Sequence, residues 1–232
     1  MLLDCSDFYE TETSFLSKNL NYHDLELNKA QLIVKGFEKE ISTLYNDLII
    51  ARVHRDNNCS YPFSKIDFLS HKLQEIIYPQ CVPKIHFGIF DNKEEPMFIL
   101  ERVPLDKLHI AYNIKRQKYY QDNSKNYYFN SDFFTLSAND DIDRLAKEHN
   151  IRVTNMQHEY ANFVNKYGIA FDHSHVNITW NNNIPISVEV HKCRRDYLFN
   201  FNNCLNYINS LPQDKELKKE ALTILNRIEE LL

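Results

Sequence analysis

The chain has 232 residues, of which 43% are apolar and 25% charged, and its formal net charge is −5. This length fits one domain or one domain of two lobes, and the composition is that of a soluble globular protein. The negative charge disfavours a general nucleic-acid binder, and no apolar run is long enough to span a bilayer. The N-terminus lacks the features of a signal peptide, and five scattered cysteines without a CxxC pair indicate reduced thiols. We therefore expect a cytoplasmic protein.

The first half of the chain is predicted to consist of strands around one helix. Residues 1–28 are polar and weakly patterned, so we expect a helical or irregular lead-in. Period-two patterns with β-branched residues and short connections then predict antiparallel strands. The expected strands are 31–36, 40–45, 47–54, 82–90 and 96–103. Between the third and fourth of them, 64–77 has apolar residues at helical spacing, with Ser64 as a candidate N-cap.

The second half is predicted to be mostly helical. We expect helices over 105–118 and 140–167, separated by an aromatic, Asn-rich insertion at 119–138. A hairpin-like pair, 177–180 and 185–190, comes next. Two amphipathic helices close the sequence. The apolar stripe of the last one is Leu217, Ala221, Leu225, Ile228 and Leu232.

One polar constellation stands out between these helices. Asp172 and Asn177 are five residues apart, and Glu189 follows twelve residues later in the next predicted strand. In a kinase, an Asp at the first position accepts the proton of the substrate hydroxyl, while the Asn and the strand carboxylate hold Mg²⁺. Glu189 is one methylene longer than the usual Asp, and Mg²⁺ requires near-octahedral geometry at short distance. Asp and Asn also favour turns, so the same residues have a second interpretation as loop formers.

The order of three strands, a helix, two strands and a helical remainder resembles the protein-kinase fold over about residues 30–210. Five segments carry the resemblance to the glycine-rich loop, the lysine strand, the hinge, the catalytic loop and the metal strand. They are Val34–Tyr45, Ile50–Val53, Phe98–Pro104, Ala170–Asp172 and Val188–His191. The resemblance implies a two-lobed α+β fold, with a five-stranded antiparallel N-lobe plus one helix and a reduced helical C-lobe. The implied boundaries are 1–28 for the lead-in, 29–103 for the N-lobe and 104–232 for the C-lobe.

The resemblance also assigns roles to individual residues. Asp172 is the implied catalytic residue, and Asn177 and Glu189 are the implied metal ligands. The implied cofactors are ATP and Mg²⁺ or Mn²⁺, if the site is functional. The implied nucleotide-binding residues are Gly36, Arg52, Glu101 and Val103, with Leu100 as gatekeeper.

Arg52 stands where the strand lysine of a kinase would be. Arginine keeps the positive charge but is bulkier than lysine and not interchangeable with it. Its partner on the helix 64–77 is left open between Asp67, His71 and Glu75.

Several positions depart from the kinase pattern. Only Gly36 remains in the glycine-rich loop, acidic Glu38 and Glu40 follow it, and His191 replaces the final glycine of the metal strand. These departures predict a degenerate kinase-like protein with weak or no phosphotransfer, acting by partner binding. About forty residues follow the metal strand, which is similar to the short effector kinases that bacterial pathogens inject into host cells (the OspG/NleH-type group). That resemblance implies a host protein as partner and secretion into the host cytosol without a signal peptide. The negative net charge gives the expectation that nucleic acid is not a partner.

Two other functions stay open. The first is an active, divergent kinase-fold transferase that uses ATP and Mg²⁺ to transfer a phosphoryl group or AMP to protein. The second is a metal-dependent enzyme, because His173, His175, Glu189 and His191 form two short pairs of metal-ligating types. Residues i and i+2 of an extended segment share one face, so each pair has converging side chains in that interpretation.

Overall fold

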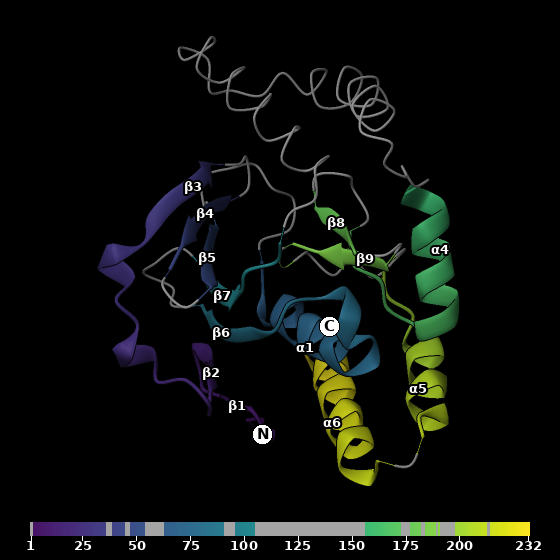
Figure 1. The fold of residues 1–232 in the computed structure, drawn as a ribbon. Coiled ribbons are helices and arrows are strands. Elements are labelled where there is room, and N and C mark those ends of the chain that lie inside the picture. Colours follow the sequence, from purple (N-terminus) through teal and green to yellow (C-terminus); the bar gives the residue numbers. More distant parts are fainter. Residues whose placement is uncertain are drawn as a thin grey trace, which may run out of the picture.

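The computed structural model has an antiparallel sheet on one side and helices on the other (Figure 1). It describes residues 2–35, 39–44, 47–53, 63–90, 96–104, 156–172, 177–181, 184–188, 190, 198–212 and 214–232. The mixed α+β class and the antiparallel sheet predicted from the sequence are confirmed.

Seven strands form the main sheet, in the order β1-β2-β6-β7-β5-β4-β3. Their bounds are Phe8–Glu10 (β1), Ser14–Ser17 (β2), Gln31–Lys35 (β3), Lys39–Thr43 (β4), Leu48–Val53 (β5), Ile85–Ile89 (β6) and Met97–Glu101 (β7). Five of them match the predicted strands, but the prediction of an irregular lead-in and a five-stranded sheet is wrong. The hairpin β1–β2 lies within the lead-in and pairs with β6, which extends the sheet by two strands.

The lead-in was hard to recognise as β-structure because its strands are only three and four residues long. Short 3-10 helices then connect the hairpin to β3, at Tyr22–Asp24 (η1) and Leu27–Lys29 (η2), and a third lies at Pro79–Cys81 (η3). A period-two pattern needs a run longer than the three or four residues of β1 and β2 to be detected in a polar segment.

The sheet is buried on both faces around β5. Ile49, Ala51 and Val53 pack in the cluster that contains α1, whereas Leu48 and Ile50 pack in a second cluster on the opposite face. Successive side chains of a strand point to opposite faces, which explains this division. Because both faces are covered, β5 has an almost continuous apolar sequence.

Helix α1 (Lys65–Ile77) covers one face of the sheet, and its start at Ser64 is as predicted. The Ser64 backbone N–H and hydroxyl both donate to the Asp67 carboxylate, at 2.6 and 3.2 Å. This reciprocal cap fixes the helix start. The fully buried Phe68, Leu69 and Leu73 face the core.

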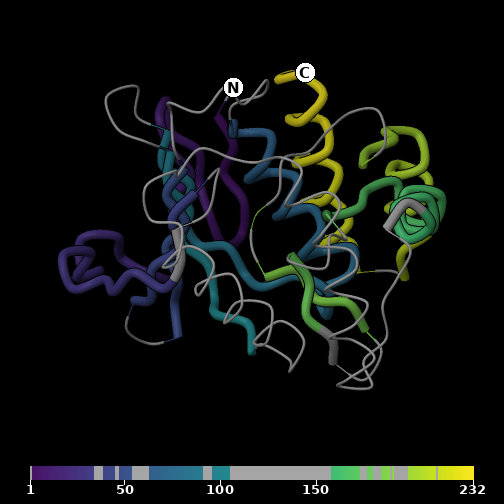
Figure 2. Tube along the Cα trace, turned by 90° about the horizontal axis from the view of Figure 1, so that it is seen from above, coloured from purple at the N-terminus to yellow at the C-terminus, as the bar shows by residue number. Residues whose placement is uncertain are grey.

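Three further helices and a hairpin make up the described part of the second half. The helices are α4 (Met156–Tyr167), α5 (Phe201–Ser210) and α6 (Lys215–Leu231), and the hairpin strands are β8 (Ile178–Asn181) and β9 (Ile184–Ser187). The hairpin lies between the main sheet and α4, and α6 packs along α1 (Figures 1 and 2). The expected helix 105–118 and insertion 119–138 lie outside the described residues.

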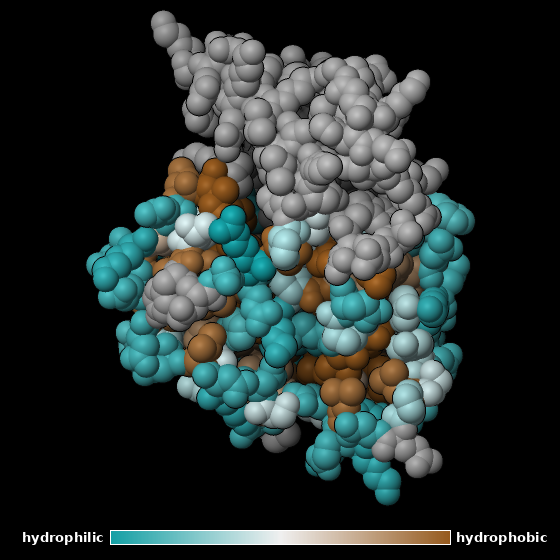
Figure 3. Space-filling model, in the orientation of Figure 1, coloured by the Kyte–Doolittle hydropathy of each residue, from teal (hydrophilic) through white to brown (hydrophobic). Residues whose placement is uncertain are grey.

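The apolar stripe predicted for α6 is correct in its middle and wrong at its ends. Ala221, Leu225 and Ile228 are buried together with Ile224, while Leu217 and Leu232 are 40% and 43% exposed. Figure 3 shows apolar surface between α6 and α5, and further apolar patches lie on the same face. None of the described helices is both long and apolar enough to cross a membrane.

Candidate functional site

The predicted catalytic and metal residues of the loop lie in contact. The Asn177 amide Nδ2 donates to Asp172 Oδ2 at 3.1 Å, and the Tyr160 hydroxyl donates to Asp172 Oδ1 at 2.6 Å. Tyr160 is buried on α4, where it packs against Ala170 and Leu198. Tyr160 lies within the predicted helix 140–167. A helical pattern does not show which distant side chain its hydroxyl will contact.

A glycine brings the chain from α4 to this loop. Gly168 has a φ of +78°, a region that side chains other than glycine seldom adopt, and its N–H donates to Val164 O at 3.0 Å. A Cβ at Gly168 would lie 2.0 Å from the backbone nitrogen of Cys204. The close passage of α5 therefore requires glycine here, four residues before Asp172.

Helix α1 holds the segment that precedes Asp172. Gln74 Nε2 donates to Ala170 O at 3.4 Å, Tyr78 OH donates to Ile169 O at 3.2 Å, and Phe171 lies in the same buried cluster as α1. The loop is thus positioned from two sides, by α4 through Tyr160 and by α1 through the backbone.

Arg52 does not face this loop. The residues on either side of it, Ala51 and Val53, point toward α1, so Arg52 lies on the opposite face of β5, in the row of Ile50. The register places Glu40 and Met97 opposite Arg52 on the flanking strands. The resemblance to the kinase pattern put Arg52 in the place of the lysine, but the strand parity directs its side chain away from α1.

The three candidate partners of Arg52 on α1 have other roles. Asp67 caps the helix, and His71 Nε2 lies 2.7 Å from Pro83 O in a hydrogen bond. Glu75 accepts from Ile85 N at 2.6 Å and from Lys72 Nζ at 3.1 Å. Burial raises the pKa of Glu75 to about 7, against the lowering effect of Lys72. None of the three faces Arg52, which lies on the far face of the sheet.

A lysine that the sequence did not single out occupies the face toward α1. Lys39 pairs with Val53 in the sheet and is only 8% exposed. Its Nζ donates to Val190 O at 2.7 Å and lies 4.7 Å from the centroid of the Phe63 ring. The predicted strand begins at Glu40 and excludes Lys39, whereas β4 begins at Lys39. Its spacing of two from Ile41 was the signal that could have placed it on the inner face.

The predicted hinge lies at the end of β7. Leu100 is fully buried on the α1 side, the Glu101 side chain is half exposed, and Val103 is half buried. Two backbone N–H groups of this segment donate to neighbouring segments. Glu101 N–H donates to Lys84 O at 2.8 Å, and Arg102 N–H donates to Asp47 O at 2.6 Å. The binding roles of Glu101 and Val103 stay predictions.

The remaining predicted site residues lie outside the described residues. They are Gly36 of the glycine-rich loop, the proposed metal ligand Glu189, and His173, His175 and His191. Within the described ranges, no group of three or more His, Cys, Asp or Glu side chains is arranged to hold a metal ion. Of the implied metal ligands, the described part of the chain places only Asn177, whose amide oxygen has the chemistry that Mg²⁺ accepts.

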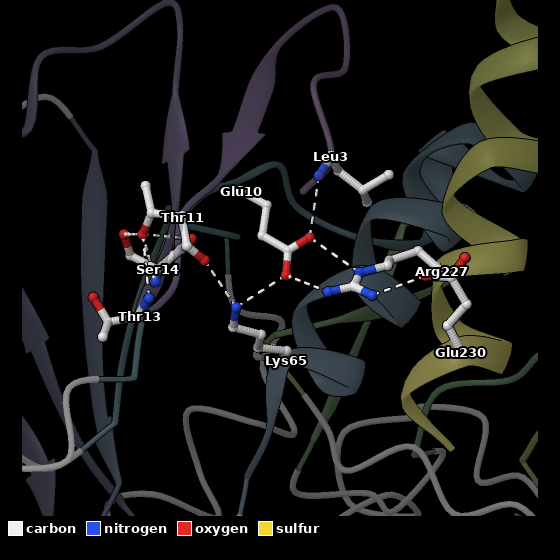
Figure 4. Close-up of polar contacts among 8 residues, drawn as sticks. All are labelled: Leu3, Glu10, Thr11, Thr13, Ser14, Lys65, Arg227 and Glu230. Atoms are coloured by element: carbon white, nitrogen blue, oxygen red, sulfur yellow. Dashed lines mark hydrogen bonds and ion pairs between the residues drawn. The ribbon is translucent and has the colours of Figure 1, made fainter. Parts of the chain in front are cut away.

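A buried carboxylate fixes α1 from the other end (Figure 4). Glu10 of β1 accepts from Lys65 Nζ of α1 at 2.9 Å and from Arg227 of α6 at 2.9 and 3.1 Å. It also accepts from Leu3 N at 3.2 Å, and its side chain is fully buried. Glu10 therefore joins the N-terminal hairpin, α1 and α6.

Comparison with solved structures gives a distant likeness. No protein-family model and no curated protein matches the sequence. The chain is similar to a solved structure, the GDP and kanamycin complex of the aminoglycoside phosphotransferase APH(2")-IIia, at 10% identity and a TM-score of 0.27. The match covers 90% of this chain and 87% of that chain. At this TM-score the likeness carries no weight for function, so the kinase-like interpretation depends on the order of the elements and on the contact between Asp172 and Asn177.

Proposed function

We propose that the chain is a degenerate protein-kinase-like protein that acts by binding a partner protein, with weak or no phosphotransfer. The contacts of Asp172 carry this proposal. Both of its carboxylate oxygens already accept hydrogen bonds, from Tyr160 at 2.6 Å and from Asn177 at 3.1 Å. A catalytic base must offer one of these oxygens to the substrate hydroxyl.

The position of Arg52 supports the same conclusion. Catalysis of phosphoryl transfer consists almost entirely of positioning and charge stabilisation, so a misplaced cation removes a large part of it. Arg52 lies on the face of β5 away from α1 and from the loop. A site assembled from the residues that the kinase pattern names would therefore lack its strand cation.

The partner that we propose is a protein of a host cell. The support is the resemblance of the sequence to short effector kinases, which also suggests delivery into the host cytosol. The proposed class of partner is thus a host-cell protein.

The proposal is tested by incubating the protein with a host-cell lysate and ATP labelled at the γ or the α phosphate. Mg²⁺ and Mn²⁺ are each supplied in turn, and the Asp172→Ala variant is the matched control. We expect the wild-type protein and the variant to give the same background label. Label transfer that is lost in Asp172→Ala would reject the proposal.

The second candidate is an active, divergent transferase that uses ATP and Mg²⁺. It is favoured by the buried cation Lys39 on the inner face of the sheet. The same assay separates its two forms, because phosphoryl transfer moves the γ label and AMP transfer moves the α label.

A further inference from the structure

We propose that the outer edge of β3 is the surface where the partner protein binds, and that an extended segment of the partner adds to this edge as a further strand. This inference rests on the partner binding of the proposed function, and it names the surface and the kind of segment that the surface takes. It requires neither a nucleotide nor a reaction at Asp172.

The position of β3 in the sheet makes the first step. β3 is the last strand in the order of the sheet, and among the described strands it pairs only with β4 (Figure 1). The outer edge of such a strand presents backbone N–H and C=O groups with which an added strand can pair. β3 has five residues, whereas β1, at the opposite end of the sheet, has only three and offers a shorter edge.

The exposed side chains of β3 make the second step. Leu32 is 59% exposed and Ile33 is 40% exposed, and the two are neighbours in the chain. The other exposed large apolar side chains in the described ranges have no such neighbour; they are Leu2, Tyr9, Ile184, Leu217 and Leu232. Single exposed apolar residues are normal on a protein surface. An apolar pair on a sheet edge, in contrast, gives an added strand side chains to pack against.

A bulge in β3 makes the third step. Leu32 pairs with Ser42 and Val34 pairs with Ile41, so Ile33 is the extra residue of the bulge and has no direct partner on β4. Cross-strand side-chain pairs are the main source of stability in a sheet. The exposed Ile33 therefore contributes little to the pairing of β3 with β4, and an added strand would cover it.

The charge of this segment indicates the chemistry of the partner. From Lys29 to Lys35 the chain has two lysines and no acidic residue. Lys29 pairs with Glu26 at 2.8 Å, but both side chains are more than half exposed, and such a pair contributes little. A partner segment with acidic residues at its ends complements this edge.

A second copy of this chain is a less favourable occupant. Lys29 and Lys35 are equally far from Leu32 in the sequence. Two β3 strands paired antiparallel about Leu32 would therefore bring Lys29 of one copy to Lys35 of the other, and like charges across paired strands are destabilising. The occupant that we propose is thus a different protein, whose extended segment has apolar residues in the middle and acidic residues at the ends.

The competing explanation is that β3 is a protected edge. Bulges and lysines are features by which proteins prevent unwanted pairing at a sheet edge. In that case no extended segment binds at β3, and Leu32 and Ile33 contact only solvent. The two explanations differ in whether a strand-forming peptide binds there.

The first test selects short random peptides, displayed on phage, for binding to the wild-type protein. Selected peptides are synthesised, and fluorescence anisotropy gives their affinities for the wild type, Leu32→Glu and Leu217→Glu. The last variant is the matched control, because it places the same charge on an exposed leucine of α6. We expect Leu32→Glu to weaken binding about tenfold or more and Leu217→Glu to change it less than about twofold. A selection that gives no peptide whose affinity depends on Leu32 would overturn the inference.

The second test uses only the wild-type protein and a selected peptide, so it does not depend on the folding of any variant. Successive residues of a strand direct their backbone N–H groups to opposite sides. N-methylation at every second residue of the peptide should therefore abolish binding, while N-methylation at the residues between them should be tolerated. The bound peptide should also slow amide hydrogen exchange in β3. Binding without this alternation, or slowed exchange only outside β3, would contradict strand addition.

A third measurement separates the occupants and the two proposals. Sedimentation of the free protein should give the mass of one chain, and a dimer that is lost in Leu32→Glu would make a second copy the occupant and overturn the inference. Failure at β3 leaves the labelling assay with Asp172→Ala as it stands. Label transfer in that assay would reject the proposed function without changing the peptide result, so the two failures are distinguishable.

Discussion

At the scale of single residues, the contact between Tyr160 and Asp172 is the feature that most restricts the chemistry of the loop. A phenol at 2.6 Å holds one carboxylate oxygen, and Tyr160 itself is held by packing against Ala170 and Leu198. A double-mutant cycle with Tyr160→Phe and Asp172→Ala should give a coupling of about 1–2 kcal/mol in the free energy of unfolding. Urea denaturation of the four proteins measures it.

A control cycle combines Tyr160→Phe with Asp214→Ala, which removes the N-cap at the start of α6. Because Asp214 accepts hydrogen bonds from Glu216 and Leu217 rather than from α4, these two changes should add within about 0.5 kcal/mol. Additivity in the first cycle would show that the Tyr160 hydrogen bond does not form in solution.

Gly168 is the second residue whose identity the structure explains. Replacement by alanine would strain a φ of +78° and place Cβ against the backbone of Cys204. We expect Gly168→Ala to lower the free energy of unfolding by at least about 2–3 kcal/mol. The backbone atoms of Cys204 cannot move away from the new Cβ as a flexible side chain could. Ala161→Gly, on the exposed side of α4, should cost only about 1 kcal/mol. Similar costs for the two changes would contradict the tight passage at α5.

At the scale of elements, periodicity predicted most of what the structure shows. The strands β3 to β7, the start of α1 at Ser64 and the tail helices all follow from apolar spacing and local capping. The spacing of apolar residues does not show which strands pair in space or which face a given side chain points to. It did not reveal that a three-residue strand would join the sheet, or that Lys39 belongs to β4 and faces inward while Arg52 faces outward.

Helix α6 shows the same limit within one element. Leu217 and Leu225 are equivalent in the apolar stripe, but Leu225 is fully buried beside α1 and Leu217 is 40% exposed. We therefore expect Leu225→Ala to cost about 2–5 kcal/mol and Leu217→Ala to stay within about 0.5 kcal/mol of the wild type. Thermal unfolding of both variants makes the comparison, and equal costs would mean that α6 does not pack on α1 as described.

At the scale of the whole molecule, the buried carboxylate of Glu10 joins the N-terminal hairpin to α1 and to α6 (Figure 4). Removing one partner of a buried ion pair leaves uncompensated charge, so Glu10→Gln should cost about 3 kcal/mol at pH 7. Glu12→Gln, which changes an exposed glutamate two residues away, should cost little. Denaturant titrations of both variants at several pH values measure the difference.

The pH dependence follows from the pKa of Glu10. Burial raises this pKa, but hydrogen bonds from Arg227, Lys65 and the Leu3 N–H outweigh burial and leave it below the ordinary value of 4.5. A carboxyl with a lowered folded-state pKa stabilises the fold above its unfolded value and loses that contribution as the pH falls through the folded value. The stability gap between the wild type and Glu10→Gln should therefore be constant above pH 4.5 and shrink below it. A gap that does not change with pH would rule out the charged network.

The sheet half and the helical half share one buried cluster, which contains both Val53 and Phe171. The site that we describe lies where these halves meet, with Lys39 contributed by the sheet and Asp172 and Asn177 by the loop after α4. The motif spacing identified Asp172 and Asn177 as a pair, and the structure shows a hydrogen bond between their side chains. It could not predict the cation, because that residue comes from another strand and is identified only by register.

A crystal structure of the protein grown with ATP and Mg²⁺ tests the central claim most directly. The account predicts that Tyr160 and Asn177 keep their contacts with Asp172. An Asp172 released from Tyr160 toward the γ phosphate would contradict it.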